Sequence, residues 1–203
     1  MRRLVADETT VREAVDVLRR GGVVAYPTDT LYGLAVDPRS DAAVERLFAV
    51  KGRERRQAIP LIAADSEQAA LAGRLTPEAS RLARAFWPGP LSIVVEAQPL
   101  LSAAVISEDG TIAVRVPAHP LACELARAFR FCVTSTSANL SGHPATASPD
   151  VVAATLADRV DLLLDGGTAP GGPPSTMLAF RDGAPVLLRA GAIAWERVLK
   201  FLE

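Results

Sequence analysis

The residues of this sequence that could do chemistry lie in polar segments that interrupt an apolar pattern. They supply hydroxyls, amides, guanidinium groups and one lysine. The segments are Thr28-Asp29-Thr30, 51–56 (KGRERR), Arg115, 134–142 (TSTSANLSG), 165–176 (DGGTAPGGPPST) and Arg189. Cations and hydroxyls stabilise negative charge. These groups therefore favour a pocket for an anionic ligand that makes many hydrogen bonds.

Histidine and cysteine are scarce. The sequence has two histidines, His119 and His143, and two cysteines, Cys123 and Cys132. No Ser/His/Asp set or Cys/His pair is evident, and the spacing is not that of a zinc site. Two cysteines also give no disulfide framework, which fits a reducing compartment. The sequence therefore favours positioning and charge neutralisation over a side-chain nucleophile.

Each polar segment also has a purely structural interpretation. The Thr28-Asp29-Thr30 segment could close a turn, and the basic run after Lys51 could complement a helix dipole. The run 134–142 could be a polar loop, and 165–176 lacks the Gly-Lys-Ser/Thr of a phosphate-binding loop. Arg115 is the hardest to explain in this way, because an arginine within an apolar strand needs an anionic or hydrogen-bonding partner.

The remaining sequence alternates strand and helix patterns. Strands are predicted at 23–26, 59–63, 91–96, 111–116, 131–134, 161–164, 176–180 and 186–189. Helices are predicted after a capping box at Thr10–Glu13, after Ser40, after Thr76, at 120–129, after Ser148 and around 195–202. Most polar segments follow a predicted strand, which is the edge where open α/β sheets bind ligands. We expect one α/β domain over residues 1–203, with a mixed sheet flanked by helices.

Composition excludes several classes of function. Of the 203 residues 49% are hydrophobic and 22% charged, and the net charge is −1, so the chain is not built to wrap nucleic acid or coat a membrane. No signal peptide or membrane-spanning stretch is evident, and a cytoplasmic location is expected. Only Lys51 and Lys200 are lysines among the 22 basic residues. This bias suggests that Lys51 has a role that arginine does not fill.

Seven motifs in order resemble the YrdC-like family of L-threonylcarbamoyladenylate synthases. They are YPTDTLYGLAVDP, KGR, WPGPLSIVV, TIAVRVPAHP, STSANLSG, DGG followed by PST, and LLRAGAI. The resemblance implies a twisted open α/β sheet with a large, concave, positively lined cavity. It also implies a nucleotidyltransferase that condenses L-threonine, bicarbonate or CO2, and ATP to threonylcarbamoyl-AMP and pyrophosphate. That product supplies the threonylcarbamoyl group of adenosine 37 in tRNA.

The resemblance also assigns residues to ligands. The implied L-threonine site consists of Thr30, Arg115, Ser135 and Ser175. The implied ATP site consists of Lys51, Arg53, Thr111, Ser137, Asn139 and Arg189, with Lys51 and Arg53 as the catalytic cations. Mg²⁺ is expected with the triphosphate, without a dedicated carboxylate ligand or an organic cofactor. Separate proteins that transfer the group to tRNA are the expected partners.

The sequence departs from the family pattern at several positions. Ile59 stands where many relatives have Asn, Ala64 lies near their usual His, and 145–147 (ATA) replaces their Ser-Pro-Thr. The chain stops soon after LLRAGAI, so it is expected to be the short, single-domain form. Two alternatives stay open, namely an RNA-binding module and a same-fold enzyme that uses carbamoyl phosphate or another substrate. Weak direct RNA binding also stays open.

Overall fold

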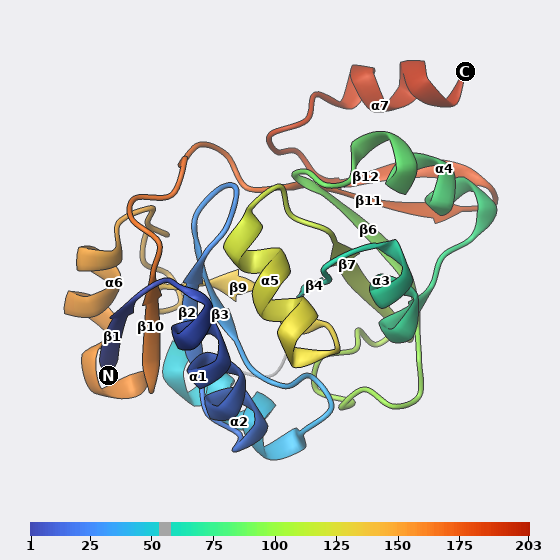
Figure 1. Ribbon diagram of the computed structural model, residues 1–203. Coiled ribbons are helices and arrows are strands. Elements are labelled where there is room, and N and C mark those ends of the chain that lie inside the picture. Colours follow the sequence, from blue (N-terminus) through green and yellow to red (C-terminus); the bar gives the residue numbers. More distant parts are fainter. Residues whose placement is uncertain (53–57) are drawn as a thin grey trace.

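The strands form two adjoining sheets. The computed structural model describes residues 1–52 and 58–203 (Figure 1). Backbone hydrogen bonds divide its strands into a five-stranded and a seven-stranded sheet. The predicted α/β class with mixed parallel and antiparallel pairing is confirmed, but the strands belong to two sheets. Figure 1 shows one sheet beside the N-terminus and the other below the C-terminal helix, with a central helix, α5, between them.

The five-stranded sheet carries the N-terminal hairpin. Its order is β1 (Arg2–Val5), β10 (Leu162–Asp165), β2 (Val24–Pro27), β3 (Tyr32–Ala35) and β9 (Thr136–Ser137). The first three strands are parallel, and β2, β3 and β9 pair antiparallel. Every residue of β2 and β3 is buried. The segment that follows β2 is therefore a hairpin turn, and β3 is a buried strand that the sequence pattern did not separate from it.

The seven-stranded sheet carries the longer strands. Its order is β12 (Ala184–Arg189), β11 (Thr176–Arg181), β6 (Leu91–Ala97), β7 (Thr111–Arg115), β4 (Leu61–Ile62) and β8 (Val133–Thr134), and β5 (Gly73–Arg74) pairs with β6. The chain crosses between the two sheets at Ser135, because β8 belongs to this sheet and β9 to the other. The Ser/Thr run therefore lies at the junction of the sheets.

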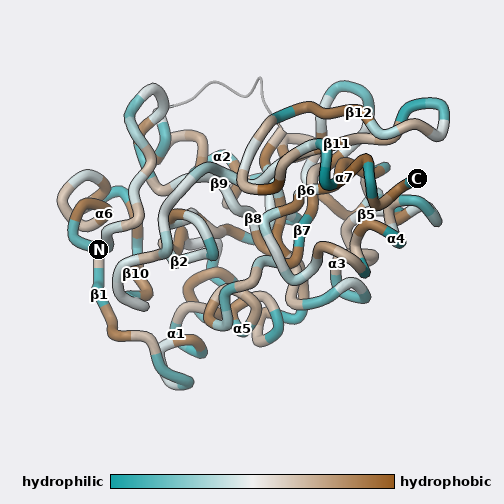
Figure 2. The backbone as a smooth tube through the Cα atoms, turned by 90° about the horizontal axis from the view of Figure 1, so that it is seen from above, coloured by the Kyte–Doolittle hydropathy of each residue, from teal (hydrophilic) through white to brown (hydrophobic). Residues whose placement is uncertain are grey.

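The helices cover both sides of this framework. They are α1 (Glu8–Arg19), α2 (Asp41–Lys51), α3 (Ser66–Ala72), α4 (Pro77–Phe86), α5 (Pro120–Phe129), α6 (Pro149–Leu156) and α7 (Trp195–Leu202), with a 3-10 turn at Ala157–Arg159. Seen from above in Figure 2, α1, α5 and α3 lie along one side of the molecule, and α2 and β9 lie toward the other. No helix within residues 1–52 and 58–203 is long and apolar enough to cross a membrane.

Side-chain caps start several helices where the sequence predicts them. Ser40, Thr76 and Ser148 each accept a hydrogen bond from the third backbone N–H of their helix. The capping box of α1, however, is one turn earlier than predicted. Asp7 accepts from the Thr10 N–H, and the Thr10 hydroxyl accepts from the Asp7 N–H, both at 2.8 Å. An aspartate at the N-cap accepts the N–H of the third helical residue as a threonine would, so the cap lies at Asp7 and α1 begins at Glu8.

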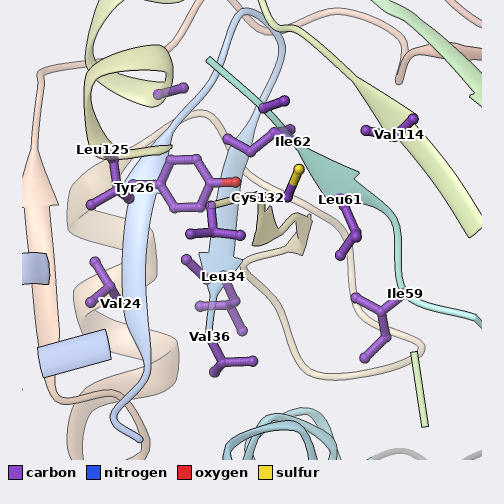
Figure 3. Packing of buried hydrophobic residues seen from close by; sticks show 14 of the residues in the cluster. Val24, Tyr26, Leu34, Val36, Ile59, Leu61, Ile62, Val114, Leu125 and Cys132 are labelled. Carbon is purple, nitrogen blue, oxygen red and sulfur yellow. The ribbon is translucent and has the colours of Figure 1, made fainter. Parts of the chain in front are cut away.

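A common core joins the two sheets. Figure 3 shows Val24, Tyr26 and Leu34 of the β2–β3 hairpin, and Val36 directly after it, near Leu61 and Ile62 of β4, with Leu125 of α5 next to Tyr26. Full burial of one such aliphatic side chain stabilises the fold by about 1.5–3 kcal/mol. The strand ends that carry the polar segments are thus fixed to a packed interior.

Candidate functional site

A cavity of about 560 Å³ is lined from both sheets. Its walls come from the β2–β3 turn, the β8–β9 junction, and residues of β6, β7, β11 and β12 with the segment before β11. We call it the main cavity. Six of the residues predicted to bind ligands line it: Thr30, Arg115, Ser135, Ser137, Ser175 and Arg189. The structure therefore brings together side chains that are spread over 160 positions of sequence around one space.

The β2–β3 turn explains the two threonines after the first core strand. Thr28 shapes the turn, because its hydroxyl donates to the Leu31 carbonyl at 2.8 Å and accepts from the Thr30 N–H at 3.2 Å. The Thr30 hydroxyl lies 3.2 Å from that of Thr28 and is held at the cavity wall. Thr28 thus has the structural role that the sequence left open for it, and it also lines the cavity.

Arg115 finds its partner in Asp29. It lies at the end of β7, is only 6% exposed, and its Nη1 lies 2.5 Å from Asp29 Oδ1. The other carboxylate oxygen of Asp29 accepts from the Ala118 N–H at 3.1 Å. The anionic partner that Arg115 was expected to need is therefore a residue of the hairpin turn, which the sequence analysis did not assign to the site.

Ser175 and Arg189 form the opposite wall. Arg189 donates from Nε and Nη2 to the Ser175 carbonyl, at 3.1 and 2.9 Å, and from Nη2 to the Ser175 hydroxyl at 2.9 Å. That hydroxyl also lies 2.9 Å from the Ser92 hydroxyl. Sequence reasoning missed Ser92, although a serine within the apolar strand LSIVV could have indicated a buried polar contact.

Gly191 packs closely against the backbone of the segment that carries Ser175. A Cβ at this position would lie 2.2 Å from the Pro174 carbonyl oxygen and 2.5 Å from atoms of Ser175 and Thr176. The next residue, Ala192, donates its N–H to the same carbonyl at 2.9 Å. Only glycine allows this close approach of two backbones. The LLRAGAI motif thus fixes the position of Ser175.

The main cavity favours anions. Loss of solvation together with the nearby Arg115 lowers the pKa of Arg189 from its usual value. No acidic side chain is among the described residues that line the cavity. An anionic ligand would relieve the repulsion between the two guanidinium groups, since opposite charge within a few ångströms favours the charged form.

Lys51 holds the Ser-Ala-Asn loop. Its Nζ donates to the Ser137 carbonyl at 2.6 Å and to the Asn139 carbonyl and side-chain oxygens at 3.1 Å each. The Ser137 hydroxyl donates to the same Asn139 side-chain oxygen at 2.6 Å. A compact ammonium suits three converging acceptors better than a planar guanidinium does. This accounts for a buried lysine in an arginine-rich chain. Arg53, its predicted companion, lies outside the described residues.

Thr111 lies in a second cavity of about 400 Å³. Ala58, Pro60 and Met177 line both cavities, so the two adjoin. The Thr111 hydroxyl donates to Asp109 at 2.7 Å, and hydrogen bonds from Ser107 and Thr111 lower the pKa of Asp109. Along β7, Thr111 and Arg115 are separated by about 13 Å at roughly 3.3 Å per residue. One strand therefore places the two predicted ligand contacts at separate ends of the joined cavities.

The residues that depart from the family pattern lie in two kinds of place, the protein interior and the wall of the main cavity. Ile59 is 1% exposed and belongs to the hydrophobic core. Ala64 is also buried, and its N–H donates to Gln68 Oε1 at 2.7 Å. Ala145, by contrast, lines the main cavity and offers it no hydroxyl. The third departure is thus the one that changes the cavity wall.

A larger depression of about 850 Å³ runs along α1 and α5. Its two arginines are paired with acids on their own helices, Arg12 with Glu8 and Arg127 with Glu124. Such exposed pairs leave little net charge for a ligand. No group of three or more metal-binding side chains occurs in the described part of the chain. The main cavity is therefore the better candidate site.

Known proteins are similar to this chain in sequence and fold. Residues 16–191 match the Sua5/YciO/YrdC family, which carries the description telomere recombination. The chain is 34% identical over 197 residues to a threonylcarbamoyl-AMP synthase of Pyrococcus abyssi, covering 97% of this chain and 58% of that protein. It is 42% identical over 177 residues to a threonylcarbamoyl-AMP synthase of Halorhodospira halophila, covering 86% of this chain and 92% of the relative.

A solved structure agrees with these sequence matches. The crystal structure of Pyrococcus abyssi Sua5 complexed with L-threonine superposes with a TM-score of 0.92 at 34% identity. It covers 99% of this chain and 59% of that protein. The chain thus spans somewhat less than two thirds of the length of this relative.

Proposed function

Because the chain belongs to the Sua5/YciO/YrdC family, we propose that it is an L-threonylcarbamoyladenylate synthase. In this proposal it joins L-threonine, bicarbonate or CO2, and ATP into threonylcarbamoyl-AMP and releases pyrophosphate. The observation that carries the proposal is the main cavity, where a buried arginine and a second guanidinium face the same space among clustered hydroxyls. It has the charge and the hydrogen-bonding groups that an amino acid and a triphosphate need.

We assign the amino-acid end to Arg115. Its guanidinium would bind the threonine carboxylate, because a planar fork of N–H donors matches the two oxygens of a carboxylate. Thr30, Ser135 and Ser175 lie in the same cavity and would bond the polar atoms of the substrate. Ser135 is held by its N–H, which donates to the Pro60 carbonyl at 2.7 Å. The substrate would thus be bound by groups that the fold has already oriented.

We assign the nucleotide end to Arg189, Ser137 and Thr111. Arg189 would face the phosphates, and the second cavity would take the part of the nucleotide beyond them. Lys51 would act here through Ser137 and Asn139, whose loop it fixes. Arg53 stays a predicted phosphate contact. This arrangement supports binding ATP beside threonine, with its phosphates at the Arg189 end of the main cavity.

The chemistry fits such a site. The amine of threonine attacks CO2 and loses a proton, or attacks bicarbonate with loss of water, and forms a carbamate. A carbamate oxygen then attacks the α-phosphorus of ATP. The bond between the α-phosphorus and its bridging oxygen breaks, and pyrophosphate leaves with the electron pair. Neither step needs a nucleophilic side chain. Both need reactants held in line and negative charge neutralised, which is what arginines and hydroxyls contribute.

Mg²⁺ would enter with the triphosphate. Asp29 is already bonded to Arg115 and Ala118, and no acidic side chain is among the described residues of the cavity lining. These residues therefore do not fit a dedicated metal site of the protein. Phosphate oxygens and water are the usual partners of Mg²⁺ in such complexes.

We propose that separate proteins take the threonylcarbamoyl group from threonylcarbamoyl-AMP and transfer it to tRNA. We also propose that the chain acts in the cytoplasm. Weak direct RNA binding stays a prediction.

Pyrophosphate release tests the proposed function. Purified protein is incubated with ATP and bicarbonate, with L-threonine present or omitted, and the adenylate is identified by its mass. Threonine-dependent release together with threonylcarbamoyl-AMP is the expected result. Release that does not depend on threonine would reject the proposal and favour another substrate for the same fold.

A further inference from the structure

Asp29 is buried beside the main cavity without lining it. Its side chain is 8% exposed and its two oxygens have separate donors, Nη1 of Arg115 at 2.5 Å and the N–H of Ala118 at 3.1 Å. The Arg115 side chain is 7% exposed. Asp29 therefore touches the arginine of the cavity wall but is not among the residues that a ligand in the cavity meets.

This carboxylate connects three parts of the fold. Asp29 belongs to the β2–β3 turn, Arg115 ends β7, and Ala118 precedes α5. The turn comes from one sheet and β7 from the other. A carboxylate anchored at one oxygen by backbone leaves its other oxygen in a fixed place. Arg115 must then adopt the side-chain conformation that reaches this oxygen.

The pairing orients Arg115 without using up its donors. A guanidinium has five N–H groups, and the contact with Asp29 uses Nη1. The remaining groups can meet a carboxylate in the cavity. Without Asp29, a flexible arginine would sample several conformations, and immobilising a side chain of this kind weakens binding by about 2- to 10-fold.

We propose that Asp29 is the positioning residue of the amino-acid site, and that it orients the Arg115 guanidinium for the carboxylate of L-threonine. This inference rests on the proposed function, since it takes threonine as the ligand. It predicts a selective effect. Changing Asp29 weakens the use of threonine and leaves the use of ATP nearly unchanged, because Arg189 is held by Ser175 and not by Asp29.

Asp29→Asn tests the proposal. Asparagine keeps the size of the side chain and removes the charge. We expect KM for L-threonine to rise by up to about 10-fold, because Arg115 must then be immobilised on binding, and KM for ATP to change by less than about 2-fold. The matched control is Asp37→Asn. Asp37 forms an ion pair with Arg39, at 2.8 and 2.9 Å, that does not line the main cavity.

A double-mutant cycle separates positioning from a general loss of stability. Asp29→Asn is made in the wild type and in Arg115→Gln, and KM for L-threonine is measured in all four proteins. If Asp29 acts through Arg115, Asp29→Asn adds less than about 2-fold once Arg115 is changed. If Asp29→Asn does not fold, Asp29→Glu replaces it. Glutamate keeps the charge but shifts the carboxylate by one methylene, and the same selective rise is expected.

Three outcomes would overturn the inference. They are an unchanged KM for L-threonine in Asp29→Asn, an equal rise in both KM values, and an undiminished effect of Asp29→Asn in the Arg115→Gln protein. A wild type that does not use L-threonine at all would reject the proposed function, and this inference with it. The wild-type control therefore distinguishes the two failures.

Discussion

The two arginines of the main cavity are held in different ways. Arg115 is 6% exposed and paired with the carboxylate of Asp29. Arg189 lies at the end of an edge strand, and its hydrogen bonds within the described residues all go to Ser175, which is neutral. The positive charge of Arg115 is thus neutralised by Asp29, whereas Arg189 has no acidic hydrogen-bond partner among the described residues.

The different partners of Arg115 and Arg189 suit them to different proposed substrates. A charge-balanced, oriented guanidinium suits a small ligand with one carboxylate, because orientation then matters more than net charge. A guanidinium whose pKa is lowered by partial burial and by Arg115 suits a polyanion, whose charge offsets that repulsion. We therefore expect threonine at the Arg115 end and the phosphates of ATP at the Arg189 end.

Arg115→Gln should have the largest effect. It removes the proposed partner of the threonine carboxylate, and KM for L-threonine should rise by about 10- to 100-fold, as for a charge-assisted bond of about 1.5–3 kcal/mol. It also leaves Asp29 buried without its cation, which should lower the free energy of unfolding by about 3–5 kcal/mol. Steady-state kinetics and denaturant unfolding measure the two effects.

The control for this prediction is Arg115→Gln combined with Asp29→Asn. The second change removes the unpaired charge, so most of the stability should return while threonine use stays weak. Recovery of both would contradict the assignment of Arg115 to the threonine carboxylate.

Arg189→Gln should act on the other substrate. We expect KM for ATP to rise by about 10-fold, since a cation facing the phosphates is lost. The midpoint of thermal unfolding should change little, because no buried carboxylate is left without a partner. Kinetics with each substrate varied in turn check this. A rise in KM for threonine alone would contradict the assignment of Arg189 to the phosphates of ATP.

Gly191→Ala should have a smaller effect that reaches both ends. The added Cβ would lie 2.2 Å from the Pro174 carbonyl oxygen, so the backbone that carries Ser175 must shift. Overpacking of this kind destabilises by about 1–3 kcal/mol. Thermal unfolding and both KM values measure it. Gly183→Ala provides a contrast, because a Cβ there would meet nothing within 4 Å and only the positive φ of 76° opposes the change. An equal effect of the two variants on both KM values would contradict the role of the close contact between Gly191 and Pro174.

His119 should have the smallest effect, which is a contribution to the pH dependence of the free energy of unfolding. Burial lowers the pKa of His119, while the nearby Asp29 opposes the shift. The unfolded chain then binds a proton more readily than the folded protein, so stability falls as pH drops below about 6.5 and is unaffected well above it. Unfolding in denaturant at about pH 7.5 and pH 5.5 measures the slope. His119→Gln should reduce this slope of stability against pH, and His143→Gln, at an exposed position, is the control. An unchanged slope in His119→Gln would contradict the role of His119 burial.

The sequence predicts most of the long helices and strands, and six of the residues that it assigns to ligands line one cavity. Helices such as α2 and α4 follow from their caps, and β6 and β7 follow from their apolar runs. Short strands such as β9 could not be predicted, because a two-residue strand has no periodicity of its own. The division into two sheets was not predicted either, since it depends on the change of partner at Ser135.

The partners of individual side chains were harder to predict than the side chains themselves. Arg115 was expected to need an anion, but Asp29 lies 86 positions earlier and looks like a turn residue. Ser92 carried no signal beyond its place in an apolar strand. Lys51 was expected to differ from the arginines, and its three oxygen partners give a geometric reason. Only the tertiary fold brings such groups together.

Isotope labelling shows whether ATP and threonine react with each other at the two ends of the main cavity. The protein is incubated with ATP, L-threonine and ¹³C-labelled bicarbonate, and the products are analysed by mass spectrometry. We expect an adduct of AMP and threonine that carries one ¹³C atom, formed together with pyrophosphate and absent when threonine is omitted. Formation of AMP or ADP without that adduct would contradict the claim that the two ends of the cavity bind ATP and threonine for one reaction.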